Sequence, residues 1–599
     1  MAERIVSPGV FTRERDLSFL PAGIAAIGAC IIGPTVKGPA FVPTQVSNFS
    51  EFEEMFGSTD QRYYTPYAVE QYLSSAGSVT IVRVLNTGGY TADSVELFVS
   101  GAGAATKQTL AVLLPSRGGS NGTADLEGST LTVGADWLAS SITLSGSNWG
   151  TKSLTVQSAY AFSFDTGSAD YIGNVFSIDP QVQKSGANTV GAYLYKNFKY
   201  AQSSNGYGAT AEVTASHGTF TSPTSYSNAS TPYIQSQLIN SSRYNLFKIN
   251  TRSHGSDVNN KYKVLILNVK KAGSVAGSDY GQFSLQLRQT GLNDNGLTTD
   301  NILEQWDALN FDPLSTNFFA RRIGDRYVTI DANGKLTHNG DWNNRSKHIY
   351  LSDFSDISNG SVPKTLSPMG HAAINNPFGS DDSSIPAWTF KVSQSNAQGE
   401  FDSNVAIGVD YGNKDTEEYL APYPTSAGDG ANTTMSLEDY NGSADASVTG
   451  DTYSDGTEKI TLALSSIKQR KFVVPFQGGF DGDNPANPKL TGASITDVNT
   501  QGFDISSATA AGAVAYKKAI NAISNPDEFD INMLVTPGVI HDIHPKITNH
   551  AIQKCEERGD AFYIVDCGIQ GGSIGDATDA VTALDTNYAA TYYPWVKIV

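Results

Sequence analysis

The sequence predicts a multidomain protein with one α/β domain that is split between the N- and C-terminal segments and carries large β-rich (α+β) insertions. First, the 599 residues exceed one hydrophobic core, since cores stop growing at roughly 250–300 residues. Second, the chain has 57 glycines and only 17% charged residues, which is typical of strands joined by tight turns. Third, strand and helix patterns alternate near both ends, which predicts a parallel or mixed sheet.

The first α/β segment covers residues 21–94. Residues 23–33 are a nearly continuous apolar run, as expected for a strand buried on both faces. Residues 79–85 are rich in β-branched side chains and predict a second strand. Two helices are expected between these strands, each from an N-terminal signal: a capping box at Asn48 and Glu51, and Pro66 at a first helical position.

The second α/β segment covers residues 471–599 and opens with a strand followed by a Gly/Asp turn. Helices are expected over residues 507–523, 545–558 and 576–587. Strands are expected over residues 529–535, 561–566 and 592–599. The simplest topology joins both segments in one domain, because the cost of closing a long insertion grows slowly with its length.

Between these segments the sequence predicts β-rich insertions. Residues 95–160 are dominated by Gly, Ser and Thr and suggest a small β-rich domain. Residues 161–470 combine short strand patterns with polar loops and are expected to form one or more further β-rich domains.

Residues 1–20 are expected to form an exposed arm, because they hold too few apolar side chains to anchor themselves. The arm is either a frayed terminus or a strand that completes the sheet of a neighbouring subunit. The residues expected to form such an intersubunit strand are Val10, Phe11, Thr12, Arg13, Glu14, Arg15, Asp16 and Leu17.

Composition narrows the classes of partner. A net charge of −19 argues against a basic face for direct nucleic-acid binding, although Arg321, Arg322 and Arg326 could meet opposite charges locally. The sequence contains no stretch of about 18 apolar residues, so membrane insertion is not expected. The three cysteines include no CxxC pair, so neither a disulfide framework nor a zinc knuckle is expected, and folding in a reducing cytoplasm fits.

The candidate catalytic and ligand-binding motifs are weak, so no catalytic residue, metal or cofactor is expected. His541 and His544 lack a third defined metal ligand, and a loop or capping role is expected for them instead. Residues 568–575 lack the GxGxxG spacing and are expected to form a βα turn. Residues 481–483 are expected to form a polar turn rather than a Ca²⁺ site. Cys555 is expected in the core of its helix.

Several stretches, in their order along the chain, carry a resemblance to a known family. They are residues 7–10, 33–57, 67–85, 315–327, 477–482, 529–539 and 593–595. Together they resemble the contractile tail sheath proteins of tailed phages (the myovirus type) and of related injection systems. Each motif is short, and their shared order makes the resemblance more specific than any one of them.

The resemblance implies a structural protein and not an enzyme. It implies an inner α/β domain made by residues 21–94 and 471–599, with the β-rich insertions protruding outward. Sheath subunits stack as six-fold rings into a helical sleeve around a rigid tube, and their terminal arms add strands to neighbouring subunits. The implied partners are other copies of the chain, the tail tube protein, and the baseplate and tail terminator proteins. The implied location is the virion tail, after assembly in the host cytoplasm.

Sheath chains normally continue well past the stretch that resembles residues 593–595. The resemblance therefore implies that the inner domain written in this sequence lacks a C-terminal remainder and arm. Two other classes of protein remain open from the residues themselves. A β-rich virion adhesin would suit the Gly/Ser/Thr-rich middle, and a hydrolase could be built on the α/β segments.

Overall fold

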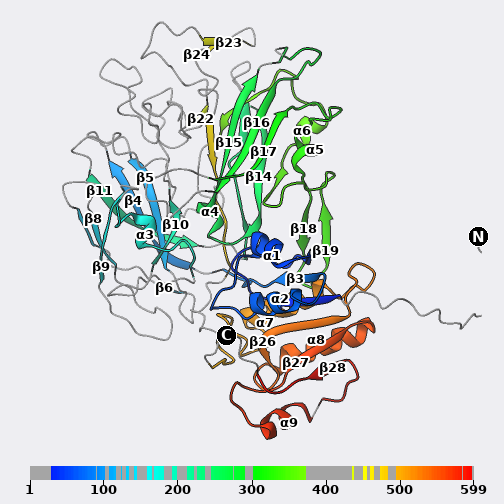
Figure 1. Cartoon of the computed structure of the whole chain (residues 1–599). Coiled ribbons are helices and arrows are strands. Elements are labelled where there is room, and N and C mark those ends of the chain that lie inside the picture. Colours follow the sequence, from blue (N-terminus) through cyan, green and yellow to red (C-terminus); the bar gives the residue numbers. More distant parts are fainter. Residues whose placement is uncertain are drawn as a thin grey trace, which may run out of the picture.

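The computed structural model describes most of the chain and shows a mixed α/β fold of several sheets, with more strands than helices (Figure 1). The described residues are 28–89, 91–100, 107–115, 123–124, 130–133, 140–144, 158–164, 168–180, 192–197, 212–221, 225–236, 244–270, 272–273, 275–289, 301–372, 435–436, 450–454, 459–463, 472–482, 494–582 and 584–595. The expected arm strand, Val10 to Leu17, lies outside them. None of the helices in these ranges is long and apolar enough to cross a membrane.

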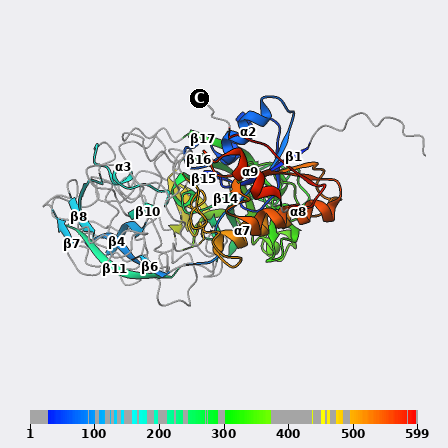
Figure 2. The same cartoon turned by 90° about the horizontal axis from the view of Figure 1, so that it is seen from below.

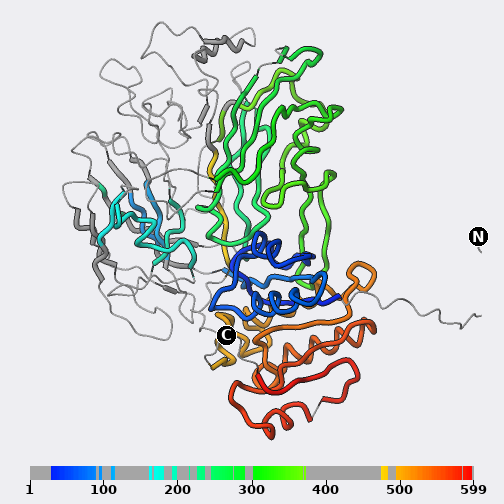
Figure 3. Tube along the Cα trace, viewed as in Figure 1, coloured from blue at the N-terminus to red at the C-terminus, as the bar shows by residue number. Residues whose placement is uncertain are grey.

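Both ends of the described chain contribute to one six-stranded sheet, which we call the shared sheet (Figure 3). Its strands, in spatial order, are β2 (Thr44–Val46), β3 (Val79–Arg83), β1 (Ala29–Gly33), β26 (Met533–Ile540), β27 (Phe562–Asp566) and β28 (Ala589–Thr591). All neighbours pair in parallel except β2 and β3. The central strand β1 is fully buried, as its apolar run predicted, and it joins the early strands to the late ones.

Helices cover both faces of the shared sheet (Figure 2). Helices α1 (Phe49–Phe56) and α2 (Thr65–Leu73) pack on one face, where Phe52, Phe56 and Val69 meet Ile31 and Ile81. On the other face, α7 (Ala511–Ala522) and α8 (Pro545–Arg558) enclose a second core. Because alternate residues of a strand face opposite ways, β1 supplies Ile31 to the first core and Cys30 to the second.

Two helix boundaries follow directly from the sequence. At the start of α1, the Oδ1 atom of Asn48 accepts the N–H of Glu51 at 2.8 Å. The reciprocal bond of the capping box goes to Ser47, whose N–H donates to the Glu51 carboxylate at 2.9 Å. Helix α8 begins at Pro545 and ends before Gly559, which takes the left-handed conformation with φ 74°.

The insertion after β3 contains two sheets. The larger, which we call the side sheet, has the order β10 (Ala192–Asn197), β5 (Lys107–Pro115), β4 (Thr91–Ser100) and β11 (Glu212–Thr221), with β6 (Thr123–Ala124) on β4. The smaller consists of β7 (Thr130–Val133), β8 (Ser140–Leu144) and β9 (Ser158–Phe162), followed by α3 (Ile172–Val175). The sequence predicted a domain boundary at residue 160. Strands β5 and β10 lie on either side of that residue and pair in one sheet, so the chain is not divided there.

The middle of the chain forms two more sheets, which we call the middle sheets. One has the order β17 (Asn301–Leu309), β16 (Gln282–Gln289), β15 (Tyr262–Lys270) and β25 (Phe472–Pro475). The other has the order β12 (Asn228–Ser230), β14 (Asn245–His254), β13 (Ile234–Ser236), β21 (Pro368–His371) and β22 (Met435–Ser436), with β20 (Ile349–Ser352) on β14. They share one core, and its aromatic centre includes Phe247, Phe283, Phe311 and Phe319.

Shorter elements complete the middle region. The helices are α4 (Val258–Lys261), α5 (Phe319–Ile323) and α6 (Ser355–Ser358). The hairpins are β18 (Tyr327–Ile330) with β19 (Leu336–Asn339), and β23 (Gly450–Ser454) with β24 (Lys459–Ala463). Strand β25 pairs with β15, so the residues just after the expected boundary at 471 belong to a middle sheet.

Some elements near the C-terminus differ from the sequence-based expectation. Strand β26 begins at Met533 instead of residue 529, because the residues before it form a turn. In this turn the side chain of Asn525 accepts the N–H of Asp527, and the carbonyl of Asn525 accepts the N–H of Phe529. Helix α9 (Ile574–Thr582) begins before residue 576, where Ser573 and Asp576 cap each other. The last strand was expected over residues 592–599, but residues 592–595 are not in a strand and β28 comes just before them; residues 596–599 lie outside the described ranges.

Candidate functional site: a buried junction between the sheets

Arg83 stands at the end of β3, where the shared sheet meets the middle sheets, and is only 3% exposed. Its Nη1 atom donates to the carbonyls of Gly38 and His254, each at 2.7 Å. Its Nε atom donates to the carbonyl of Thr35 at 3.3 Å. Burial lowers the pKa of this guanidinium below its ordinary value, and the carboxylates of Asp481 and Asp257 oppose that effect. One side chain therefore joins the loop after β1 to the end of β14.

The loop from Gly38 to Phe41 is bound to β14 by further hydrogen bonds. The N–H of Gly38 donates to the hydroxyl of Ser253 at 2.8 Å, and the N–H of Ala40 donates to Nδ1 of His254 at 3.1 Å. Burial is the main cause that lowers the pKa of His254 to about 3, with Arg83 adding to it. The imidazole is therefore neutral at physiological pH, as an Nδ1 acceptor must be.

The turn at residues 477–482 closes the junction from the second α/β segment. Phe480 exchanges two backbone hydrogen bonds with Ser227, at 2.9 and 3.0 Å. Gly479 exchanges two more with the Asn259 side chain, at 2.7 and 3.0 Å. A Cβ atom on Gly482, whose φ is 87°, would stand 1.9 Å from the carbonyl oxygen of Asn86. Glycine is therefore required where this turn passes the end of β3.

Asp481 is the acidic residue of that turn, and it is half-buried within the junction. Its Oδ2 atom accepts the N–H of Ser256 at 3.0 Å. Burial is the main cause that raises the pKa of Asp481 to about 6; Asp257 adds to the rise and Arg83 opposes it. Asp257 itself pairs with Lys261 one helical turn later. The sequence predicted a polar turn here, but the side chain of Asp481 faces the interior.

The side sheet enters the same junction through β10. The Nζ atom of Lys196 donates to the carbonyls of Asn259 and Phe476, each at 2.8 Å, and burial lowers its pKa to about 7. The N–H of Asn197 donates to the Asn260 side chain at 2.8 Å. The short helix α4 thus holds the side sheet through Asn260 and the 477–482 turn through Asn259.

A second group of ion pairs joins the segment after α3 to the loop before α2. Arg62 is 9% exposed and pairs with Asp60 at 2.8 Å and with Asp179 at 2.9 Å. Asp179 also lines a cavity of about 20 Å³ together with Tyr63, Arg83, Asp257 and Asp481. Such a volume holds about one water molecule. The junction is therefore built for connecting chain segments and is too small to enclose an organic substrate.

The β18–β19 hairpin forms a separate brace between the middle sheets and the shared sheet (Figure 1). A Cβ atom on Gly334, at its turn, would stand 2.2 Å from the Cβ of Asn521 in α7. His338 bonds to Glu528 at 2.8 Å, just beyond α7. The Nζ atom of Lys518 in α7 lies over the rings of Phe41 and Tyr226, at 5.1 and 5.3 Å.

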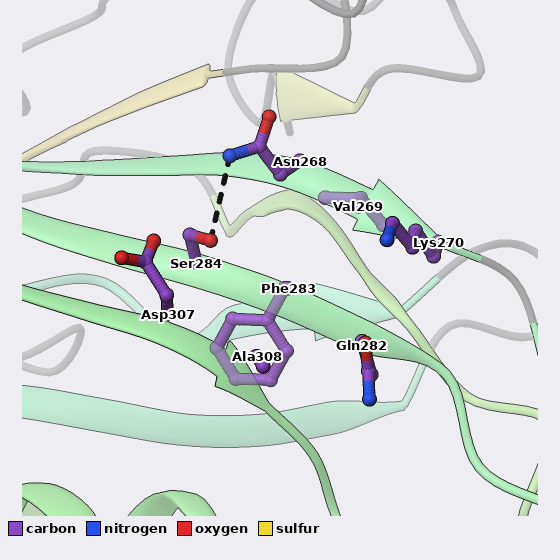
Figure 4. A pocket seen from close by; sticks show the side chains of 8 residues that line it. All are labelled: Asn268, Val269, Lys270, Gln282, Phe283, Ser284, Asp307 and Ala308. Carbon is purple, nitrogen blue, oxygen red and sulfur yellow. Dashed lines mark hydrogen bonds between the residues drawn. The ribbon is translucent and has the colours of Figure 1, made fainter. Parts of the chain in front are cut away.

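A cavity with a volume of about 430 Å³ lies on one middle sheet (Figure 4). It is lined by β15, β16 and β17, which bulge at Asn268 and Ala308, both with positive φ. Its polar groups bind partners within the sheet: Asn268 donates to Ser284 at 3.4 Å, and both oxygens of Asp307 accept from Gln305. The described lining residues offer no pairing of a nucleophile with a base.

The histidine motif has the loop role that the sequence predicted. His541 bonds through Nδ1 to the hydroxyl of Thr548 at 2.7 Å. His544 accepts the N–H of Ile540 through Nδ1 at 3.1 Å and is the residue before α8. The two rings thus serve different partners. Within the described ranges, no three His, Cys, Asp or Glu side chains are grouped to hold a metal ion.

The remaining motifs also have structural roles. Residues 568–573 form a turn between β27 and α9, as expected, while residues 574 and 575 already belong to α9; two carbonyls of the turn accept hydrogen bonds. Tyr593 donates to Gly572 O and Trp595 donates to Gly568 O, each at 2.9 Å. Trp595 also contacts the ring of Tyr64, so it links the turn to the N-terminal segment. Cys555 is buried with Ile547 and Ala551, as predicted.

Sequence reasoning missed the residues that make the junction. Arg83, Lys196 and the segment from His254 to Asn259 are distant from one another in sequence, and no short motif connects them. Two signals were present: an arginine inside the run 79–85 that is rich in β-branched residues, and a pair of glycines shortly before an aspartate at residues 478–481. Neither signal indicates which carbonyls the arginine binds.

We expect replacement of Arg83 by methionine to lower the free energy of unfolding by about 3–5 kcal/mol, because three buried carbonyls lose their donor and the nearby aspartates lose their cation. Urea unfolding followed by tryptophan fluorescence measures the change. The matched control Arg326→Met removes an exposed guanidinium and should change stability by less than about 0.5 kcal/mol. Equal small effects of both substitutions would contradict the role of Arg83.

We expect Asp481→Asn to change how stability depends on pH. The pKa of Asp481 is raised to about 6 in the folded state, so its stabilising contribution is present at low pH and is lost as pH rises through 6. The variant cannot ionise, so its stability relative to wild type should increase by roughly 2 kcal/mol between about pH 4 and pH 7. Urea midpoints at both pH values test this. Exposed Asp542→Asn is the control, and a constant difference between Asp481→Asn and wild type would refute the expectation.

Comparison with known proteins gives this geometry no further context. No protein-family model matches the chain, and no curated protein matches its sequence.

Proposed function

We propose that the chain is the structural subunit of a contractile tail sheath. Copies would polymerise as stacked six-fold rings around a tail tube, and contraction of the sleeve would drive the tube through the host envelope. The observation that carries this proposal is the parallel pairing of β1 with β26, which brings both ends of the described chain into one sheet. That arrangement fits the split inner domain of the sheath proteins that several stretches of the sequence resemble.

The proposed partners are other copies of the chain, the tail tube protein, and the baseplate and terminator proteins at the two ends of the sleeve. The proposed location is the virion tail, after assembly in the host cytoplasm. The proposed role is mechanical and not enzymatic, and it requires no cofactor. A β-rich adhesin would explain the Gly/Ser-rich middle, but it gives no reason for the two ends to share a sheet.

The buried junction supports a rigid-body mechanism of contraction. Arg83, Asn259 and Lys196 join the shared, middle and side sheets through buried hydrogen bonds. Breaking them would leave buried polar groups unsatisfied, which costs about 1–3 kcal/mol for each group. Interfaces between subunits can exchange one packing for another at lower cost. We therefore propose that contraction rotates whole subunits and leaves the junction intact.

Strand addition is the proposed link between subunits during that rotation. Among the described strands, β2 pairs only with β3 and β28 pairs only with β27, so the shared sheet has two available edges. The segment from Val10 to Leu17 would add to such an edge in a neighbouring copy. Each backbone hydrogen bond contributes about 0.5–1.5 kcal/mol, and several act together at every subunit.

We expect the purified protein to form tubular polymers of constant diameter in electron micrographs. The physical reason is that one repeated contact between identical subunits generates rings or helices. A preparation that contains only monomers or closed trimers over a wide range of protein concentration would count against the sheath function.

Deletion of residues 1–17 should abolish polymerisation and leave a folded subunit, because the deleted residues contribute the proposed added strand. Electron microscopy measures the polymers, and circular dichroism with urea unfolding checks the fold. A second variant replaces the same residues by a Gly/Ser sequence of equal length, which preserves chain length but weakens strand formation, and it should also fail to polymerise. Normal tubes from either variant would refute the strand-addition role.

A further inference from the structure

Three pairs of asparagine followed by glycine lie in the described ranges, and they begin at Asn333, Asn339 and Asn359. Such a pair can lose the side-chain amide of its asparagine without an enzyme, because glycine has no side chain to hinder the approach of its backbone nitrogen. The reaction is intramolecular, so its rate depends on how readily the two reacting atoms can meet. Three identical pairs in three environments are therefore expected to react at different rates.

The first pair forms the turn of the β18–β19 hairpin and is held on both sides. The Oδ1 atom of Asp331 accepts the N–H groups of Asn333 and Lys335, at 2.9 and 2.8 Å. The N–H of Gly334 donates to the carbonyl of Asp331 at 3.2 Å. Gly334 is also buried against Asn521 of α7. The turn cannot change its conformation without losing these hydrogen bonds and its contact with α7.

The second pair lies at the end of β19 and is held by its side chain. The Nδ2 atom of Asn339 donates to the hydroxyl of Thr329 and to the carbonyl of Thr337, each at 3.3 Å. Gly340 follows with φ 91°, and a Cβ atom on it would stand 2.4 Å from the carbonyl oxygen of Asp325. Both the amide of this pair and the backbone after it are therefore restricted.

The third pair follows the four-residue helix α6 and has few contacts. Asn359 and Gly360 are exposed, as are the residues on either side of the pair. Within the described part of the chain, no residue forms a hydrogen bond with the side-chain amide of Asn359. A Cβ atom on Gly360 would meet no other atom within 4 Å. The N–H of Gly360 donates to Ile357 O at 3.1 Å, and fraying of the helix end is enough to free it.

We propose that Asn359 is a site of spontaneous deamidation in the folded protein, whereas Asn333 and Asn339 are protected. The backbone nitrogen of Gly360 attacks Cγ of Asn359, and a new C–N bond forms. The bond from Cγ to the side-chain amide nitrogen breaks, and this nitrogen leaves as ammonia with the proton from Gly360. Water then opens the cyclic imide at either carbonyl, which gives aspartate or isoaspartate. The reaction needs no oxidant and no cofactor.

The modification changes the end of α6. Either product places a carboxylate at the C-terminal end of the helix, where negative charge is unfavourable. Asp356 in the same helix adds to the repulsion. Isoaspartate also inserts an extra carbon into the backbone just after Ile357, which is buried in the core of the middle sheets. Deamidation therefore loosens α6 and makes this part of the middle region more acidic as the protein ages.

Peptide mapping by mass spectrometry tests the proposal on the full chain, incubated at mildly alkaline pH both folded and in urea. In the folded protein we expect Asn359 to convert at least about tenfold faster than Asn333 and Asn339, because their contacts keep the reacting atoms from meeting. In urea the three rates should converge. The control Asn359→Gln keeps an amide on a longer side chain and should abolish conversion in its peptide. Equal rates in the folded protein, or an intact Asn359, would overturn the proposal.

A second variant tests why the hairpin turn is protected. Asp331→Ala removes an exposed carboxylate that accepts the N–H groups of Asn333 and Lys335. We expect conversion of Asn333 to rise toward the rate of Asn359, while Asn339 stays protected by its own hydrogen bonds. Circular dichroism and urea unfolding check that the variant is folded. If Asn333 reacts no faster in the folded variant than in wild type, hydrogen bonding by Asp331 is not what protects it, and this part of the proposal fails.

Discussion

A guanidinium that is buried at the end of a central strand must be surrounded by acceptors, because an unsolvated charge in a protein interior is very costly. Arg83 meets this requirement with carbonyls from residues 35, 38 and 254, and with the nearby carboxylates of Asp257 and Asp481. These groups come from three distant parts of the chain. The solvation of one side chain thus constrains how the shared sheet, β14 and the 477–482 turn are placed together.

The residues around Arg83 include asparagines, whose amides bind backbone groups, and glycines, which let the chain segments come close together. The side-chain amides of Asn259 and Asn260 can both donate and accept hydrogen bonds. Asn259 joins α4 to the 477–482 turn, and Asn260 joins α4 to β10. Gly479 and Gly482 allow the turn to approach other backbone atoms more closely than any side chain would. A junction of this kind joins the layers through buried hydrogen bonds.

The sequence by itself determined the local elements whose causes are local. Asn48 and Glu51 cap α1, Pro545 and Gly559 bound α8, and the apolar run 23–33 contains the buried strand β1. It also supported the pairing of the two chain ends, because helix–strand alternation occurs at both. Only the tertiary structure decided the ends of β26 and β28, the pairing of β5 with β10, and the place of Asp481 beside Arg83 and Asp257. These features depend on contacts between residues far apart in sequence. No local pattern of polarity or turn residues specifies which distant carbonyl, strand or charge will be the partner.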